Sequence, residues 1–341
     1  MSNGLDFFEF VPESRKYWFL RTQGGAFYDE FASKGYVAIG WTKIEDPKRL
    51  LSMKRADAIS SISELYPNEK RPGKIYNQLN RFYKNMRVDD VVMIPSDSSS
   101  KIRFGIIKSE PYTISKDQID NCPHLMRRTV EWVKTVDRDR LDPQLYRMTR
   151  PQNTISDASE YAPYIDRTIG SLFVKGNKAH MVIPIKTKED ISAVDLYDFM
   201  DLIFKTIPIV NEADILETKY SREDLDIKLN LQSPGLLEYI SHHAELMFGI
   251  GTVLVFVVGG SFAAKFTKES KEVNANSDGL LGKMFDFIVK RKDQEIEIMK
   301  LKKEHEMLQA KLDYQLPKEI ESPTQETLAE DPSPDTEMKS E

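Results

Sequence analysis

The chain has 341 residues but only one cysteine and five histidines, the residue types that form disulfides and many metal sites. Its single cysteine, Cys122, excludes an intrachain disulfide and a cysteine-based metal cage. One cysteine is also typical of proteins from a reducing compartment. The N-terminal residues lack the basic start and the apolar run of a secretory signal, so we expect none. The five histidines show no metal-ligand spacing such as H-E-x-x-H.

Catalytic motifs are scarce as well. The sequence holds no G-x-S-x-G elbow, no phosphate loop ending in Gly-Lys-Ser/Thr and no G-x-G-x-x-G turn. We therefore predict a non-catalytic protein without a cofactor or a metal. One pair argues the other way: Asp226 and Lys228 stand two apart on a predicted strand, as in metal-dependent nucleases where the acid binds Mg²⁺ and the lysine orients water. An exposed strand face also explains this pair, and we favour that interpretation because such tripeptides arise often by chance.

The chain also lacks an excess of positive charge: its formal net charge is −6. Residues 317–341 carry eight acids against two lysines, so this tail holds the whole excess and residues 1–316 are formally neutral. A neutral body argues against non-specific grip on duplex DNA, although it leaves room for a local basic patch. The tail is rich in Pro, Ser, Thr and Glu, and we predict that it is disordered.

Residues 1–155 alternate short β-rich segments with two helical patterns, which predicts one recognition domain. The helices are expected at 55–65 and 74–86, where apolar residues recur three and four apart. Short strands interrupted by helices are typical of a small, partly open β-barrel. The strands are expected at 17–21, 36–40, 90–94, 102–107 and 130–134, each bounded by Gly, Pro, Asp or Ser.

Residues 156–232 predict a second, small α+β domain. Strands are expected at 171–174, 180–185 and 225–231, with a helix at about 192–205. In the last strand, leucine and isoleucine alternate with Asp226, Lys228 and Asn230, which indicates one buried and one wet face.

Residues 233–266 predict a long helix, since Ser233-Pro234 is a typical helix start. Within it, residues 246–264 are 19 residues without a charge, close to the roughly 20 that a membrane span needs. A buried core helix is the alternative. Lysines after the segment place its C-terminal side in the cytoplasm. The folded region before the segment has no signal for export, so it should lie in the cytoplasm as well. The two arguments conflict for a single span, and a shallow insertion or insertion on activation would satisfy both.

Residues 284–316 predict a coiled coil and hence a homo-oligomer. Ile298, Leu301, His305, Leu308 and Leu312 recur at spacings of three and four, as in an a/d seam. The alternative is a single solvated helix. Pro317 ends the pattern.

Aromatic and basic residues occur together in the first domain, and such sets bind nucleic-acid bases by stacking and charge, although any one ring can instead belong to the core. Four stretches resemble the PUA/EVE-like N-terminal module of Mrr-type restriction and related prokaryotic defence proteins: 16–31 with 36–41, then 87–95, 103–112 and 127–145. The resemblance implies a barrel whose pocket binds a nucleotide or a modified base. By its pattern the pocket residues are Trp18, Arg21, Gly24, Gly40, Trp41 and Trp132.

Where Mrr-type relatives carry a nuclease domain, this chain has a hydrophobic helix and a heptad pattern. We therefore expect a ligand-sensing protein of the inner membrane with a cytoplasmic N-terminal domain, acting in anti-phage defence. A soluble module that binds modified nucleic acid, and a nuclease that uses Asp226 and Lys228, are the alternatives.

Overall fold

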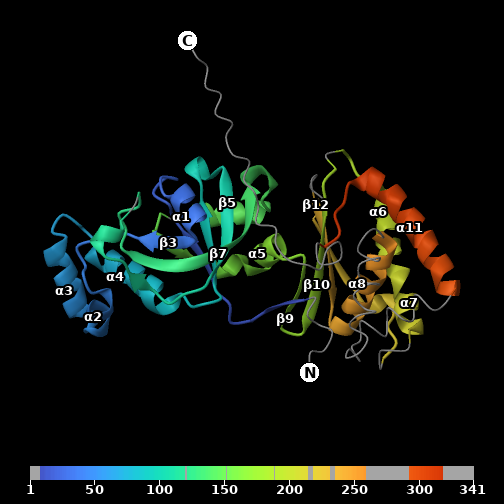
Figure 1. Ribbon diagram of the computed structural model, residues 1–341, viewed down its shortest axis with the longest axis horizontal. Coiled ribbons are helices and arrows are strands. Elements are labelled where there is room, and N and C mark those ends of the chain that lie inside the picture. Colours follow the sequence, from blue (N-terminus) through green and yellow to red (C-terminus); the bar gives the residue numbers. More distant parts are fainter. Residues whose placement is uncertain are drawn as a thin grey trace, which may run out of the picture. The chain divides into compact units, whose positions relative to one another are not determined.

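The computed structural model describes residues 8–119, 121–150, 152–187, 189–213, 218–230, 235–258 and 292–317. The chain divides into two compact units (Figure 1): Phe10–Gly176 is the first unit, and Met1–Glu9 with Asn177–Glu341 is the second. The sequence placed the end of the first domain at residue 155. The structure extends the unit because helix α5 (Ala162–Ile169) contributes Ile165 to its core.

The first unit has a mixed α+β architecture, built on a curled, half-barrel sheet (Figure 1). Its strands follow the order β3-β7-β5-β4-β2-β8, with β6 paired to β7. β2 and β4 are parallel and the other pairs are antiparallel. The strands are β2 (Tyr17–Leu20), β3 (Tyr36–Ile39), β4 (Val91–Pro95), β5 (Lys101–Ile107), β6 (Tyr112–Thr113), β7 (Met126–Asp137) and β8 (Ile155–Asp157).

The middle of this sheet is buried on both faces. In β2, Trp18 and Leu20 join one hydrophobic cluster, whereas Tyr17 and Phe19 join another. Successive side chains of a strand point to opposite faces, so this strand separates two cores. Being apolar on both faces, it reads as a continuous apolar run rather than an alternation.

Helices cover the face on which Trp18 lies: α1 (Tyr28–Lys34), α2 (Pro47–Ser52), α3 (Arg55–Leu65) and α4 (Pro72–Asn80). Local chemistry sets their ends. Gly35 ends α1 in the left-handed conformation at φ 65°. Asp46 caps the N-terminus of α2: its side chain accepts a hydrogen bond from Arg49 N, and Pro47 follows as the first helical residue.

The predicted helix 74–86 is split in the structure. α4 ends at Asn80 and a π-helical turn, η1, follows over Arg81–Asn85. Arg128 of β7 lies fully buried beneath this turn. Its guanidinium donates to the carbonyls of Phe82, Met86 and Ser109, so carbonyl oxygens surround the charge. Cations near the carbonyl end of a helix are stabilised by the helix dipole.

The opposite face of the sheet is covered by α5 and a 3-10 segment, η5 (Pro143–Thr149), through Leu145 and Met148. Two further strands of this unit, β1 (Glu9–Val11) and β9 (Leu172–Lys175), are neighbours. The remaining 3-10 turns are η2 (Asp97–Ser99), η3 (Lys116–Gln118), η4 (Arg138–Arg140) and η6 (Ser159–Tyr161).

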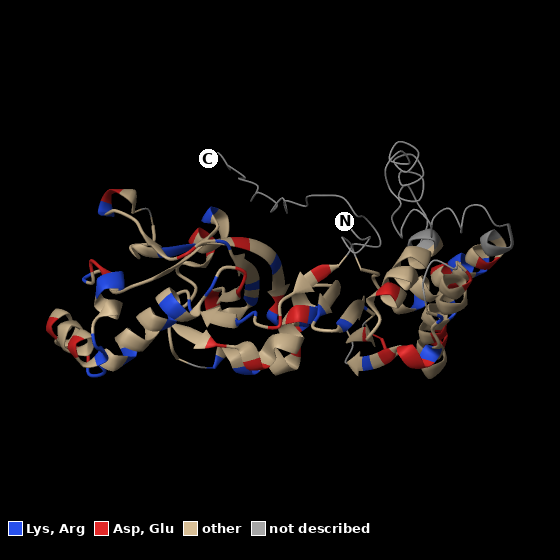
Figure 2. Ribbon diagram, turned by 90° about the horizontal axis from the view of Figure 1, so that it is seen from below, with Lys and Arg blue, Asp and Glu red and all other residues tan. Residues whose placement is uncertain are grey.

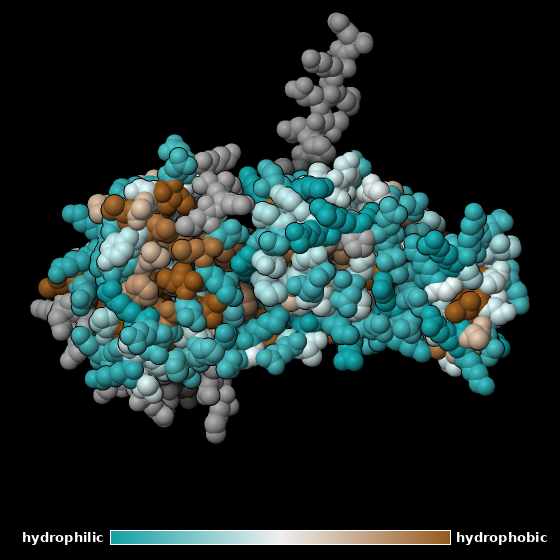
Figure 3. All heavy atoms as spheres, turned by 180° about the vertical axis from the view of Figure 1, so that it is seen from behind, coloured by the Kyte–Doolittle hydropathy of each residue, from teal (hydrophilic) through white to brown (hydrophobic). Residues whose placement is uncertain are grey.

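In the second unit, strand β12 (Gly235–Ser241) lies between β10 (Lys178–Ile185) and β11 (Asp226–Asn230), antiparallel to both. Helices α6 (Ala193–Phe204), α7 (Thr206–Glu212), α8 (Ala244–Val258) and α11 (Lys292–Leu312) complete it, with a short turn η7 (Arg222–Asp224). Hydrophobic side chains gather on one face of this unit (Figure 3), and its exposed apolar residues include Val194, Tyr197, Leu229 and Met307.

The long helix predicted over 233–266 is wrong at its start. Residues 235–241 form a central strand, and the helix begins only at Ala244, where Ser241 Oγ accepts from His243 N. A central strand buries both faces, so Leu237, Glu238 and Tyr239 show no alternation that would have revealed it. Ladder hydrogen bonds on both sides outweigh the local helix signal.

α8 contains the described part of the segment expected to cross a membrane. Its side chains at 246–248, 250, 253, 254 and 257 are buried, and the helix packs against α7, α11 and the strands β10 and β12. Gly249 allows the close approach of α7, since a Cβ there would lie 2.5 Å from Cγ1 of Val210. Across the residues that the structure describes, no helix is both long and apolar enough to span a bilayer. Residues 259–264 lie outside those ranges.

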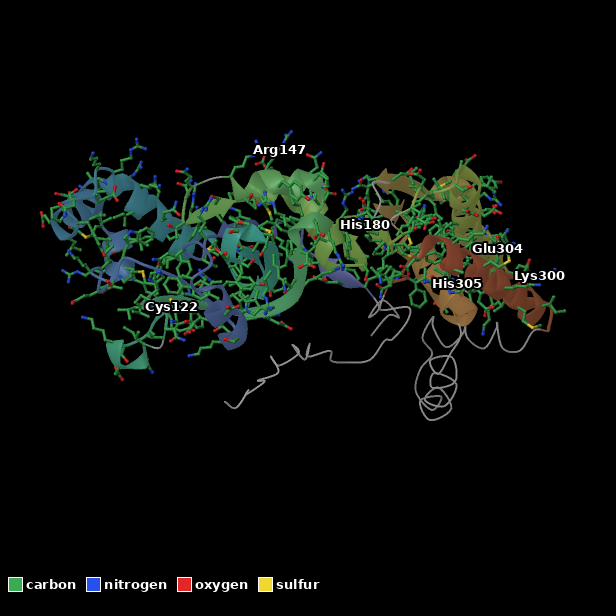
Figure 4. The ribbon with its side chains drawn as sticks, turned by 90° about the horizontal axis from the view of Figure 1, so that it is seen from above. Cys122, Arg147, His180, Lys300, Glu304 and His305 are labelled. Atoms are coloured by element: carbon green, nitrogen blue, oxygen red, sulfur yellow. The ribbon has the colours of Figure 1, made fainter. Side chains whose placement is uncertain are left out.

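α11 carries the predicted heptad seam, and that seam is occupied within the chain. Ile298, Leu301, His305, Leu308 and Leu312 are buried while the helix packs on α6 and α8. Lys205 bonds Glu304 at 2.7 Å, and Tyr314 beyond the helix bonds His305 at 2.6 Å (Figure 4). Packing within one chain therefore accounts for the apolar pattern, and a coiled coil is not shown. The acidic tail after Pro317 lies outside the described residues.

Candidate functional site

Trp18, expected in the pocket, belongs to the core. Its side chain is 1 % exposed and its Nε1 donates to Oδ2 of Asp90 at 2.8 Å. Asp90 is itself buried and also accepts from the backbone N–H groups of Lys16 and Arg87. A buried carboxylate needs such donors, so the hydrogen bond from Trp18 stabilises Asp90 in the core.

Trp132, Arg21 and Gly24 lie at separate places around the sheet. The indole of Trp132 is half-buried over Gly105, and its Nε1 donates to the carbonyl of Phe31 at 2.8 Å. Arg21 donates to the carbonyl of Thr149 at 3.0 Å. Gly24, at φ 70°, sits in an exposed turn with open space around its α-carbon.

Gly40 and Trp41, directly after β3, agree best with the predicted binding site. A Cβ added at Gly40 would lie 3.2 Å from Cε1 of His124, so the glycine lets this imidazole approach the strand. Trp41 follows at φ 70°, a left-handed conformation that bulky residues rarely adopt and that costs about 1–3 kcal/mol. Its ring is half-buried against the core cluster of the first unit. Strained backbone of this kind clusters at functional sites.

His124, just before β7, is the polar centre of this region. Its Nδ1 is buried and has no hydrogen-bond partner among the described residues. Burial lowers the pKa of the imidazole, and the charge of Arg127 lowers this pKa further, so the ring is neutral at pH 7. The ring of Phe27 packs edge-on against it, with centroids 4.9 Å apart.

Arg127 holds the segment around His124 in place. Its guanidinium lies 4.1 Å from the ring centroid of Tyr36 and donates to the carbonyls of Cys122 and His124. The Tyr36 hydroxyl donates to Glu30 at 3.0 Å, and burial raises the pKa of that hydroxyl. Burial also raises the pKa of the Cys122 thiol (Figure 4), which keeps it protonated and disfavours a role as a nucleophile.

We call Phe27, Gly40, Trp41, His124 and Arg127 the His124 cluster. It combines aromatic rings, a neutral imidazole with an unsatisfied nitrogen and a guanidinium, which together can stack on a planar ligand and bond its polar edge. The sequence pointed to Gly40 and Trp41 but missed His124 and Phe27. The histidines were searched only for metal-ligand spacing, and such a search cannot identify a single histidine that lies against a glycine and an aromatic ring.

The nuclease alternative gains no support from the second unit. Asp226 and Lys228 lie exposed on β11, and Lys228 faces Glu238 across the strand pair. Glu238 is buried and bonds His180 at 2.8 Å. Within the described part of the chain, no group of three or more His, Cys, Asp or Glu side chains could hold a metal ion.

Among the comparisons with known proteins, a family model matches one part of the chain. No curated protein and no solved structure matches the chain. The PUA/EVE resemblance therefore stays a prediction. Residues 17–157 match the model of the family described as Domain of unknown function (DUF8426), a range that spans most of the first unit.

Proposed function

We propose that the first unit is a non-catalytic sensing module that binds a nucleotide, a modified base or a base within a nucleic acid at the His124 cluster. The observation that carries the proposal is the buried Nδ1 of His124, which has no partner among the described residues. Leaving a buried polar atom unsatisfied costs about 1–3 kcal/mol, which a ligand with a complementary polar edge would recover. The half-barrel sheet is compatible with a PUA-like barrel and so supports the same proposal.

The ring faces of Phe27 and Trp41 suit a planar ligand. Stacking of an aromatic side chain on a base contributes about 1–3 kcal/mol. Because His124 is neutral, its buried Nδ1 can accept or donate one hydrogen bond, depending on the tautomer, once a ligand reaches it. A ligand whose edge offers the complementary group is therefore selected over an apolar ring of equal size.

The test is a titration of the full chain with a panel of nucleosides and modified nucleobases, followed by tryptophan fluorescence. Trp41→Ala and His124→Ala should each weaken binding at least about tenfold, the equivalent of about 1.4 kcal/mol. Trp132→Phe is the matched control, because Trp132 bonds Phe31 and lies outside the cluster. Equal affinity of His124→Ala and the wild type for every ligand bound would refute the site.

The wider role is a prediction of the resemblance and of the apolar run at 246–264. It comprises action at the inner membrane, homo-oligomerisation and a part in anti-phage defence. In the proposed sensor, a ligand shifts the protein between two states only if it binds them with different affinities.

A further inference from the structure

The helical insertion between β3 and β4 concentrates the positive charge of the chain. Residues 42–87 carry eleven lysines and arginines against five acids, a formal net charge of +6. Because residues 1–316 as a whole are neutral, the rest of that range carries −6. The whole-chain charge conceals this separation.

Most of these cations face solvent on α2, α3, α4 and the adjoining turns (Figure 2). Ten of the eleven are exposed, and we call them the basic helical face: Lys43, Lys48, Arg49, Lys54, Arg55, Lys70, Arg71, Lys74, Lys84 and Arg87. Over the ranges that the structure describes, none of the ten forms an ion pair, in contrast to Lys175 with Asp166 or Lys205 with Glu304. Their charge is therefore available to an external anion.

Tyrosine rings lie among these cations. Lys43 is 5.4 Å from the centroid of the Tyr66 ring, and Arg55 is 5.8 Å from that of Tyr76. Both rings are half-buried and keep part of their surface in solvent. Alternating cations and aromatic rings are typical of surfaces that follow a single strand of nucleic acid, where cations contact phosphates and rings stack on bases.

The basic helical face is continuous with the His124 cluster. Lys43, two residues after Trp41, donates from its backbone N–H to the Tyr66 hydroxyl at 3.0 Å. Its Nζ donates to the carbonyl of Leu65 at 3.1 Å. These bonds fix the end of α3 beside the turn that presents Trp41, so a strand that follows the helices can reach the cluster.

We infer that the ligand of the first unit is a single-stranded nucleic acid, whose phosphates lie on the basic helical face while one base enters the His124 cluster. This inference rests on the proposed function and narrows its ligand from a base-like molecule to a polynucleotide. A single strand is preferred over a duplex because its bases can leave the stack at little cost. An acidic polypeptide is the competing partner for such a surface.

The test compares two matched variants of the full chain for binding of a labelled single-stranded oligonucleotide of about 16 nucleotides over a range of salt concentrations. One variant changes Lys48, Arg49, Arg71 and Lys74 to glutamine. The control changes Lys101, Lys116, Arg140 and Arg147, which are two lysines and two arginines exposed elsewhere in the same unit. Each set removes the same charge, so a difference between them reports position.

We expect the basic-face variant to bind the oligonucleotide at least about tenfold more weakly, with the salt slope reduced by up to about 3 if all four cations contact phosphates. The control variant should bind like the wild type. Binding of the basic-face variant within about twofold of the control would overturn the inference, and so would equal competition by polyglutamate.

Nucleoside binding separates this inference from the proposed function. The basic-face variant should retain the nucleoside affinity of the wild type, whereas His124→Ala should lose it. If the wild type binds the oligonucleotide through the four cations but binds no nucleoside, the base site fails and the basic surface stands. If it binds nucleosides and gains nothing from the oligonucleotide, the surface fails and the base site stands.

Discussion

At the scale of single residues, Trp41 holds a conformation that its side chain disfavours. Glycine tolerates φ 70° at no steric cost, whereas alanine pays for its Cβ. Both substitutions remove the same half-buried indole, so we expect Trp41→Gly to be more stable than Trp41→Ala by about 1 kcal/mol. Urea denaturation of the two variants measures the difference, and a more stable alanine variant would contradict the assigned strain.

His124 gives the first unit a pH dependence that can be assigned to one group, because it is the only histidine between Phe10 and Gly176. Burial lowers its pKa in the folded state below the ordinary value of 6.5. The unfolded chain then binds more protons between those two values, so stability falls as the pH drops through that window.

The slope of that loss is at most about 1.4 kcal/mol per pH unit. His124→Gln does not titrate there, so we expect its unfolding free energy to change less than that of the wild type between pH 7.5 and 5.5. Chemical denaturation of the first unit at several pH values tests this. Parallel curves for the two proteins would show that His124 titrates normally in the folded state.

Single residues also show what could be read from the sequence. Of the predicted pocket residues, Gly40 lies against His124 and Trp41 follows it in the chain, whereas Trp18 is buried and bonds Asp90. Residue type alone cannot separate these cases, because a tryptophan that bonds a buried carboxylate and one that faces a ligand look alike in a sequence. Only the fold reveals which carboxylate lies opposite.

At the scale of elements, patterns set by local chemistry were predicted well. The helix at 55–65 appears with those bounds as α3, and strands were found near the expected positions in both units. Elements defined by distant partners were missed. β12 is a strand because β10 and β11 flank it, although Ser233-Pro234, which precede it in the sequence, resemble a helix cap. In the π-helical turn that splits 74–86, the carbonyl of Phe82 accepts from Arg128, more than forty residues away along the chain.

α11 offers a matched test of whether its seam packs within the chain. Leu308 is 3 % exposed and its neighbour Met307 is 57 % exposed. We expect Leu308→Ala to destabilise the second unit by about 2–4 kcal/mol, and Met307→Ala to change its stability by no more than about 0.5 kcal/mol. Denaturation, with light scattering for the oligomeric state, measures both. If Leu308→Ala instead dissociates an oligomer without destabilising the unit, the seam forms the predicted coiled coil.

At the scale of the whole molecule, charge and packing are organised by unit. The cations of residues 42–87 belong to the first unit, and the acidic residues 317–341 belong to the second. The overall charge of −6 therefore describes neither part, and a prediction from it alone would discard the nucleic-acid ligand inferred above. The membrane role of 246–264 remains a prediction, since only part of that segment is described.

Each unit has its own core, so the two should unfold in separable steps. Arg128→Met leaves the carbonyls of Phe82, Met86 and Ser109 without their buried donor, which we expect to cost the first unit about 3–5 kcal/mol. Leu308→Ala affects only the second core. We expect calorimetry to show two transitions, each shifted by one substitution, with additive shifts in the double variant. One transition that both substitutions move equally would mean that the units fold as one cooperative body.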